Sequence, residues 1–306
     1  MRAEREELHN KYRPKTFDEL IGNEALKESL LSSIQRTRTF LVYGQRGCGK
    51  TTLARLIARE LGVENIDLNE IDAADNTGVD SARSIKESAR YFPMAGKFKV
   101  YIIDEVHRLS GNAFDSLLKI LEEPPLHTYF ILCTTEFQKV PVTIKSRAKC
   151  YEVKALGEKD ANFLVRWICH EEKIHISPEV KRTILECCEG VPREIIIALD
   201  TVRDVKDDED AISLIHASVH REIRDLCQAL LNQEKWPQVA AIIKDLRDEP
   251  ERIRLSVLGY MAAVLLSGKS NDIAAMIIEQ FSQTFIYSGK AGLAYSSYMS
   301  IIPVNK

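Results

Sequence analysis

A glycine-rich segment at residues 44–51 constrains the fold of this 306-residue chain more than any other feature. It reads GQRGCGKT, follows an apolar run at residues 39–43, and precedes the sequence TLARLIAREL at residues 52–61. The apolar run has the character of a buried strand, and the segment after it has the period of an amphipathic helix. A short glycine-rich turn from a buried strand into a helix is typical of a parallel α/β sheet.

The spacing of this segment also gives it a chemical meaning. In the pattern G-x-x-x-x-G-K-[ST], the glycines let backbone N–H groups turn toward phosphates, and the helix N-terminus adds its positive dipole end. Lys50 is expected to reach the β and γ phosphates of a nucleoside triphosphate, and the Thr51 hydroxyl to bind Mg²⁺. The expected nucleotide-binding residues of the segment are Gly44, Gln45, Arg46, Gly47, Cys48, Gly49, Lys50, Thr51 and Thr52. An ordinary glycine-rich turn is the alternative.

Two carboxylates supply a second chemical element. Residues 98–103 read as an apolar strand that delivers Asp104 and Glu105 at its carboxyl end. Ligands of open α/β sheets bind at that edge. We therefore expect Asp104 to hold Mg²⁺, directly or through water, and Glu105 to orient and deprotonate the attacking water. The alternative, a strand that ends in two solvated acids, is disfavoured by the phosphate loop upstream.

Strand and helix patterns alternate through the first half of the chain. Strands are expected at 39–43, 66–72, 98–103 and 128–134, and helices at 24–33, 50–61, 79–91 and 111–122. This alternation predicts an α/β fold in which helices cover both faces of a parallel sheet. Further helices are expected at 158–172, 177–189 and 192–205, with about five more over 211–302. Ser110 and Ser177 are expected helix N-caps.

The same patterns suggest three domains. An α/β nucleotide-binding domain is expected at 1–155, a small helical domain at 156–207, and an all-helical domain at 208–306. A charged break at 205–210 supports the second boundary. The last domain shows no catalytic motif, which favours a role in assembly.

Composition limits partners and location. Forty-two Lys and Arg residues face 45 Asp and Glu residues, so nucleic-acid contact would need local basic surfaces. The seven cysteines form no C-x-x-C pair, which predicts neither a zinc site nor a disulfide framework. The N-terminus has no apolar signal core, and the longest apolar run, residues 257–266, is too short for a bilayer. A cytoplasmic protein without membrane contact is expected.

Four further positions carry chemistry but leave alternatives open. His107 follows the acidic pair, where it either contributes to chemistry or forms a structural hydrogen bond. Thr135 ends a strand at the same edge, where a hydroxyl can position water, although threonine is common in strands. Arg147 lies in an exposed turn, as a solvated residue or as an arginine finger for a neighbouring subunit. Arg193 begins a helix and faces either the phosphates or solvent.

Taken together, six segments resemble the AAA+ sliding-clamp loader ATPases. They are YRPKTFDELIGNE, GQRGCGKT, IDEVH, LEEPP, CTTEFQKVPVTIKSR and EGVPRE. The resemblance is greatest to the gamma/tau subunits of bacterial DNA polymerase III, with the replication factor C small subunits next. It is dense from residue 11 to about residue 200. It implies a P-loop α/β domain, a helical lid and a helical C-terminal collar.

The resemblance also implies roles for single residues. Thr135 matches the first sensor of the family, and Arg193 matches the second sensor. Ser146-Arg147 matches the motif whose arginine acts in trans on the ATP of the next subunit. Arg13 and Pro14 match the segment that lines the adenine side, and Ile21 of the same lead-in is expected to bind the nucleotide. The expected cofactors are ATP and Mg²⁺.

Some features depart from the family pattern. The four-cysteine zinc module of the bacterial subunit is absent between residues 61 and 69, so no zinc is expected. Ala148 replaces the cysteine that follows the trans arginine. The sequence ends at Lys306 without a tau-type tail, which suggests a compact cellular or viral relative, located at the nucleoid or in the host cytoplasm.

The family implies a pentameric assembly with other loader subunits, a sliding clamp and primer-template DNA as partners. Lys119 and Thr143 match DNA-facing positions of the family. Arg83, Lys86 and Arg90 lie at helical spacing and could track phosphates, although an ordinary solvated face is favoured. The neutral residues 76–78 weaken the case for DNA contact from their loop.

Three functions are compatible with these features. The leading hypothesis is a clamp-loader motor in which DNA aligns trans arginines that trigger hydrolysis. Another DNA-remodelling AAA+ ATPase, such as a branch-migration motor, usually carries a winged domain after the lid, and residues 211–306 lack β-hairpin patterns. A non-hydrolysing structural subunit has no physical need for Lys50, Asp104 and Glu105 together.

Overall fold

The structure is a computed structural model that describes residues 6–75, 78–219, 221–246, 250–266 and 271–301. The chain divides into two compact units, Met1–Ala211 and Ile212–Lys306. The finer division of the first unit near residue 155 stays a prediction.

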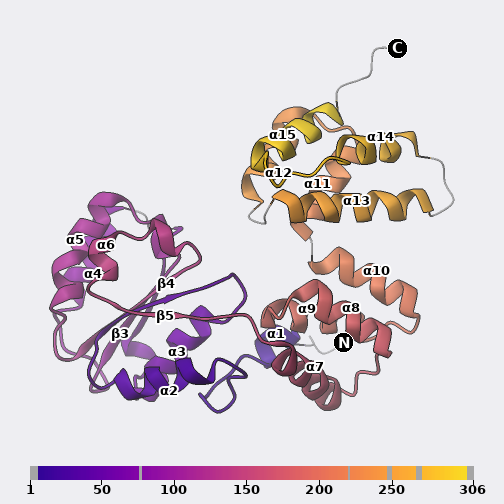
Figure 1. Ribbon diagram of the computed structural model, residues 1–306. Coiled ribbons are helices and arrows are strands. Elements are labelled where there is room, and N and C mark those ends of the chain that lie inside the picture. The colour runs from indigo at the N-terminus through magenta and orange to yellow at the C-terminus, as the bar shows by residue number, and fades with distance from the viewer. Residues whose placement is uncertain (1–5, 76–77, 220, 247–249, 267–270, 302–306) are drawn as a thin grey trace, which may run out of the picture. The chain divides into compact units, whose positions relative to one another are not determined.

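A five-stranded sheet forms the centre of the first unit (Figure 1). Its strands are β1 (Thr39–Tyr43), β2 (Leu68–Asp72), β3 (Lys99–Asp104), β4 (Thr128–Thr134) and β5 (Lys149–Glu152). They are all parallel and lie in the order β2-β3-β4-β1-β5. The sequence patterns missed β5 because Lys149, Cys150 and Glu152 are exposed, so this edge strand has no apolar run.

Helices cover both faces of the sheet, as the alternating pattern predicted. On one face, Phe40 and Val42 of β1 pack with α2 (Glu24–Ser33) and α3 (Lys50–Glu60). On the other face, Leu41 packs with helices α4 (Val79–Ser88), α5 (Gly111–Glu122) and α6 (Val142–Lys145). Successive strand residues point to opposite faces, so a strand covered on both sides must be apolar at every position.

Helix ends follow local chemistry. The side chains of Ser110 and Ser177 accept hydrogen bonds of 3.2 Å from the backbone N–H groups of Ala113 and Val180, which confirms both predicted N-caps. Helix α4 ends at Ser88, earlier than the expected residue 91. Pro93 disfavours helical geometry in this region. Arg90 therefore lies beyond the helix, and the predicted helical face of three basic residues was wrong for this member.

Three helices follow the sheet in the first unit: α7 (Glu158–Glu172), α8 (Pro178–Cys188) and α9 (Pro192–Val202). A short N-terminal helix, α1 (Leu8–Lys11), packs on α9 and was not predicted. Lys11 and the Tyr12 hydroxyl both bond to Glu172 of α7, at 2.6 and 2.5 Å. These contacts fix the N-terminal lead-in against the helices that follow the sheet.

Every element described in the second unit is a helix. Its elements are most of α10 (Asp208–Val219), then α11 (Arg221–Leu231), α12 (Trp236–Asp245), α13 (Pro250–Leu266), α14 (Asp272–Gln280) and α15 (Gly289–Met299). Leu226, Val257 and Ile277 lie in its buried core. Across the described part of the chain, no helix combines the length and the apolar character that crossing a membrane requires.

Candidate active site

The glycine-rich segment forms a tight loop between β1 and α3. A Cβ atom on Gly44 would lie 2.2 Å from the carbonyl oxygen of Val153, and Gly49 has a φ of 100°. Only glycine fits the first position, and glycine is strongly favoured at the second. The buried Lys50 side chain donates hydrogen bonds of 3.0 Å to the carbonyls of Gly44 and Gln45. The loop therefore holds an ammonium group against its own backbone.

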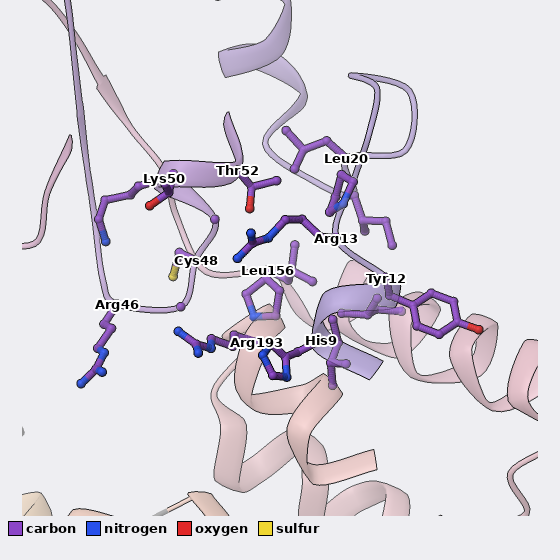
Figure 2. Close-up of a pocket in the computed structure, with 18 of the residues that line it drawn as sticks. His9, Tyr12, Arg13, Leu20, Arg46, Cys48, Lys50, Thr52, Leu156 and Arg193 are labelled. Carbon is purple, nitrogen blue, oxygen red and sulfur yellow. The ribbon is translucent and has the colours of Figure 1, made fainter. Parts of the chain in front are cut away.

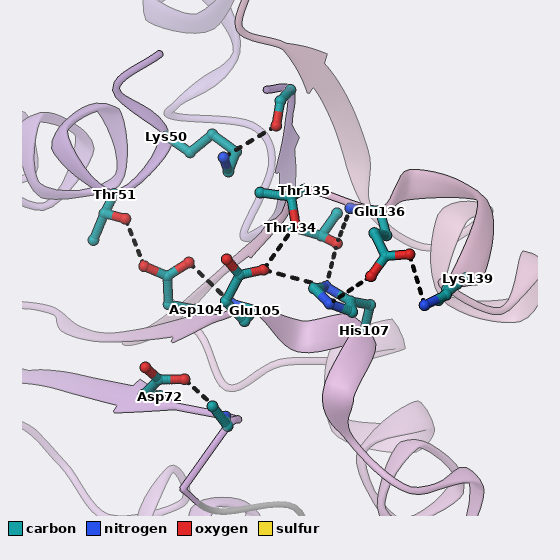
Figure 3. A network of polar contacts seen from close by, with 12 residues as sticks. Lys50, Thr51, Asp72, Asp104, Glu105, His107, Thr134, Thr135, Glu136 and Lys139 are labelled. Atoms are coloured by element: carbon teal, nitrogen blue, oxygen red, sulfur yellow. Dashed lines mark hydrogen bonds and ion pairs between the residues drawn. The ribbon is translucent and has the colours of Figure 1, made fainter. Parts of the chain in front are cut away.

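An oxygen pair lies beside this ammonium group. The hydroxyl of Thr51, at the start of α3, donates a 2.5 Å hydrogen bond to Oδ2 of Asp104, at the end of β3 (Figure 3). Hydroxyl and carboxylate oxygens are hard ligands of the kind that Mg²⁺ prefers. The two residues predicted to hold Mg²⁺ therefore come together, and their donors fit this ion.

Glu105 follows Asp104 in an unusual backbone conformation. Its φ of 48° and ψ of 40° lie in the left-handed region, which residues with a side chain seldom adopt. Oδ1 of Asp104 accepts a 2.9 Å hydrogen bond from the Glu105 N–H. The Thr135 hydroxyl donates to Oε2 of Glu105 at 3.1 Å. The adjacent ends of β3 and β4 thus bring the predicted base and the predicted sensor into contact.

A cavity of about 320 Å³ opens at this edge of the sheet (Figure 2). Predicted residues that line it are Arg13, Pro14, Ile21, Arg46, Gly47, Cys48, Gly49, Lys50, Thr51, Thr52, Asp104, Glu105 and Arg193. The lead-in, the glycine-rich loop and the first residues of α9 therefore share one cavity. Gly44 and Gln45 contribute the carbonyls that hold Lys50.

The cavity gathers positive charge. Figure 2 shows the side chains of Arg13 and Arg193 extending into the region beside the loop. Burial lowers the pKa of Arg13, and the nearby Arg55 and Arg193 lower it further. Burial also lowers the pKa of Lys50, against the opposing effect of Glu105 and Asp104. Cations held close together are stabilised by an anionic ligand, so the site suits a polyphosphate.

Some lining residues were missed. Tyr12, Trp167 and Leu156 line the cavity, and the rings of Tyr12 and Trp167 meet edge to face at 5.2 Å. Residues so far apart in the sequence give no local signal of this contact. Asp72 also lines the cavity and lies opposite Asp104 in the strand register. The rule that identified Asp104, a polar residue at the carboxyl end of a strand, could have found Asp72.

The predicted trans arginine is held elsewhere on its own chain. Arg147 is absent from the residues that line the described cavity. Its Nε donates to Glu122 at 2.9 Å, and its Nη1 donates to the Thr143 carbonyl at 2.7 Å. Glu122 ends α5, and Arg147 follows α6, so the guanidinium is fixed at the surface between two helix ends.

Four of the five predicted DNA-facing residues lie on α4, α5 and α6, and the fifth, Arg90, lies beyond the end of α4. Lys119 and Thr143 are exposed on α5 and α6. Arg83 is exposed and lies 3.4 Å from Asp80, one turn away, while Lys86 is half-buried. Asn76 and Thr77, two of the uncharged residues that weaken the case for DNA contact from their loop, lie outside the described residues.

Comparisons with known proteins relate this chain to subunits of DNA polymerase III. A family model described as DNA polymerase III, delta subunit, matches residues 63–157. The tau subunit of DNA polymerase III from Escherichia coli K12 is 34% identical over 314 residues, which cover 88% of this chain and 47% of the relative. The gamma subunit from Buchnera aphidicola is 36% identical over 213 residues, which cover 62% of this chain and 58% of the relative.

The chain is similar to bacterial clamp-loader subunits of DNA polymerase III. It spans about half the length of the curated relatives named above. Among solved structures, RuvB of Thermotoga maritima, a Holliday junction branch migration motor, aligns with a TM-score of 0.55 at 19% identity. The alignment covers 75% of this chain and 84% of that chain. At this identity the likeness concerns the AAA+ fold alone.

Proposed function

We propose that this chain is an ATP-hydrolysing subunit of a clamp loader, which opens a sliding clamp and places it on primer-template DNA. The observation that carries the proposal is the meeting of Lys50, Asp104 and Glu105 at one sheet edge, in a chain similar to DNA polymerase III tau and gamma subunits. The similarity supports a role in replication, and the geometry supports the ATPase step.

Each residue of the site has its own role in the proposed ATP hydrolysis. The loop and Lys50 bind the β and γ phosphates, and Arg13, Pro14 and Ile21 hold the nucleoside end. Thr51 and Asp104 would hold Mg²⁺, which supplies positive charge to the phosphates when it is bound. Glu105 accepts the proton of the attacking water, and Thr135 fixes the Glu105 carboxylate. Arg193 places a cation from α9 at the same cavity.

A neighbouring subunit completes the site in this proposal. Arg147 is held at the surface of its own chain by Glu122, away from the residues that line its own cavity. An exposed, fixed guanidinium can enter the nucleotide site of the next subunit in a ring. We place five subunits in the ring, joined through the helical second unit.

An exposed apolar surface supports contact with a protein partner. Tyr91, Phe92, Met94 and Leu126 are all more than 70% exposed. The Phe92 ring lies 4.7 Å from the ring of His127, so the segment after α4 adjoins the start of β4. Large exposed apolar side chains that gather on one surface mark interaction sites. We assign this surface, residues 91–94 with Leu126, to the sliding clamp.

The proposal is tested by steady-state ATP hydrolysis with and without primed DNA and a clamp, on material of known mass. We expect slow basal hydrolysis that primed DNA and clamp accelerate together. Glu105→Gln should bind ATP with unchanged affinity and hydrolyse it at least about 100-fold more slowly, because the general base is gone. A rate of ATP hydrolysis that does not change when DNA and clamp are added would exclude clamp loading. A closed six-fold ring would favour a branch-migration motor.

A further inference from the structure

His107 lies directly behind the proposed base. It belongs to the short helix Val106–Arg108 that follows β3, and only 5% of its side chain is exposed. Its Nδ1 lies 3.3 Å from Oε2 of Glu105, and its Nε2 lies 3.1 Å from Oε1 of Glu136. Figure 3 shows the imidazole between the two carboxylates. None of the hydrolysis roles proposed for the other residues involves His107.

The neighbours of the ring restrict its hydrogen bonding. The Thr134 hydroxyl lies 2.9 Å from Nδ1 and accepts a 3.0 Å hydrogen bond from the N–H of Glu136. This leaves the Thr134 proton free to be donated to Nδ1. Glu136 also pairs with Lys139 at 2.6 Å. The charged groups around the ring are therefore Glu105, Glu136, Lys139 and the adjacent Arg108.

A neutral imidazole has one N–H and can serve only one carboxylate at a time. Burial lowers the pKa of His107, although Glu105 and Glu136 oppose this effect. When Nε2–H donates to Glu136, the Nδ1 lone pair accepts from Thr134 and faces Glu105. The Glu105 oxygen is then held by Thr135 and accepts no hydrogen bond from the ring. The opposite tautomer would place a proton donor against the base and weaken it.

We propose that His107 is a positioning residue for Glu105, and that Glu136 keeps its Nε2 protonated so that Nδ1 faces Glu105 without a proton. The inference rests on the proposed ATPase function and adds a regulatory contact to the same site. Glu136 and Lys139 lie in the segment that leads into α6 and then to Arg147. The chain of contacts therefore joins the base of this subunit to the segment that carries the arginine for a neighbour.

The test measures kcat and KM for ATP with DNA and clamp present, in the full chain with its partner subunits. The amide of His107→Asn reaches the region of Nδ1, and the amide of His107→Gln reaches the region of Nε2. We expect both variants to keep KM and to lower kcat, by about 10- to 100-fold for the more damaging variant, as for other partners that orient functional groups. His107→Asn should retain more activity, because its side-chain carbonyl can accept from Thr134.

The variant Glu136→Gln keeps the test decisive if the His107 variants fold poorly, because it leaves His107 unchanged. Glu136→Gln changes a half-exposed side chain and should lower kcat without lowering ATP affinity. In a His107→Asn background, Glu136→Gln should cost little more, because the two residues act in one chain of contacts. His170→Asn, on an exposed histidine of α7 that also adjoins a glutamate, is the matched control and should leave both constants unchanged.

Unchanged kcat in the His107 and Glu136 variants, with Glu105→Gln inactive, would overturn the inference and leave the proposed function intact. If the fold-losses in kcat of the two single variants multiply in the double variant, Glu136 and His107 act independently. That result would overturn the proposed chain of contacts from Glu136 to Glu105. A total lack of hydrolysis in the unsubstituted chain, with DNA and clamp present, would instead reject the proposed function, and with it this inference.

Discussion

Glu105 and Lys50, two residues of the proposed active site, show an unusual backbone conformation and an unusual burial, respectively. Glu105 adopts a left-handed backbone conformation, and its carboxylate is held by Thr135. Such conformations persist where surrounding contacts fix them, and they cluster at functional sites. Lys50 is buried against loop carbonyls, and its displacement by phosphate oxygens would exchange one set of acceptors for another. In the proposed function, these residues are arranged for the nucleotide before it binds.

Asp67 gives a prediction about pH at the same scale. It is fully buried, and burial alone would raise its pKa. Backbone N–H groups of Met94, Ala95 and Gly96 donate to its carboxylate at 2.6, 2.9 and 3.0 Å. Together with Lys99 they lower its pKa below the ordinary value of 3.8. The stabilisation should be complete above pH 3.8 and be lost as the pH falls toward the lowered pKa.

Asp67→Asn should therefore lower the free energy of unfolding at pH 7 by about 1–3 kcal/mol. Its cost should shrink at pH 3, because below the ordinary pKa of 3.8 the unfolded chain binds a proton at Asp67 more readily than the folded chain does. Urea unfolding at both pH values measures this difference. Asp115→Asn, on an exposed aspartate of α5, is the control and should cost less than about 0.5 kcal/mol. An equal cost of Asp67→Asn at both pH values would contradict the assignment.

At the scale of elements, one buried residue fixes a segment that faces outward. Asp67 lies just before β2, and its three hydrogen bonds hold the turn at residues 94–96. The adjoining residues Tyr91, Phe92 and Met94 remain exposed. A turn held by a buried carboxylate can present apolar side chains in a fixed arrangement, which lowers the entropy that a partner must overcome on binding.

Phe92→Ser tests the assignment of this surface to the clamp. We expect unchanged ATP affinity and basal hydrolysis, weaker clamp binding by at least about tenfold, and loss of clamp stimulation. Surface plasmon resonance with immobilised clamp measures the affinity. Phe163→Ser, on an exposed phenylalanine of α7 that is 50% accessible, is the matched control. If both variants bind the clamp as tightly as the unsubstituted chain does, the surface is assigned wrongly.

At the scale of the whole molecule, the active site is proposed to be shared between chains. Mixing two inactive variants tests this directly. Arg147→Ala should keep ATP binding and lose DNA-stimulated hydrolysis by about 10³- to 10⁵-fold. Glu105→Gln lacks the base but keeps the arginine. Assembled together with the other loader subunits, the two variants should recover part of the stimulated rate, because some sites then combine an intact base with an intact arginine.

The control for this experiment is Arg182→Ala, which removes an exposed arginine of α8. Arg182→Ala alone should keep the full rate of ATP hydrolysis. A mixture of Arg182→Ala with Glu105→Gln should hydrolyse ATP no faster than a mixture of the unsubstituted chain with Glu105→Gln. Mixtures of Arg147→Ala and Glu105→Gln that stay inactive, in assemblies of confirmed mass, would show that each chain completes its own site.

Local sequence determined much of this protein. The spacing of Gly44, Lys50 and Thr51 and the carboxylates at the end of β3 predicted the parallel α/β sheet and the two sides of the proposed nucleotide site, because both depend on short-range geometry at strand ends. The helix N-caps at Ser110 and Ser177 could be predicted for the same reason. Resemblance to clamp loaders supplied roles that spacing alone left open, including those of Thr135 and Arg147.

Tertiary structure decided what depends on distant contacts. Strand β5 is held at the sheet edge by pairing with β1, although its own residues are mostly exposed. Tyr12 reaches the cavity because Glu172, 160 residues away, fixes its hydroxyl. His107 gained a role only when folding placed it between Glu105 and Glu136. Local pattern reports the periodicity and chemistry of neighbours in sequence, whereas these contacts arise from packing between elements that are far apart in the chain.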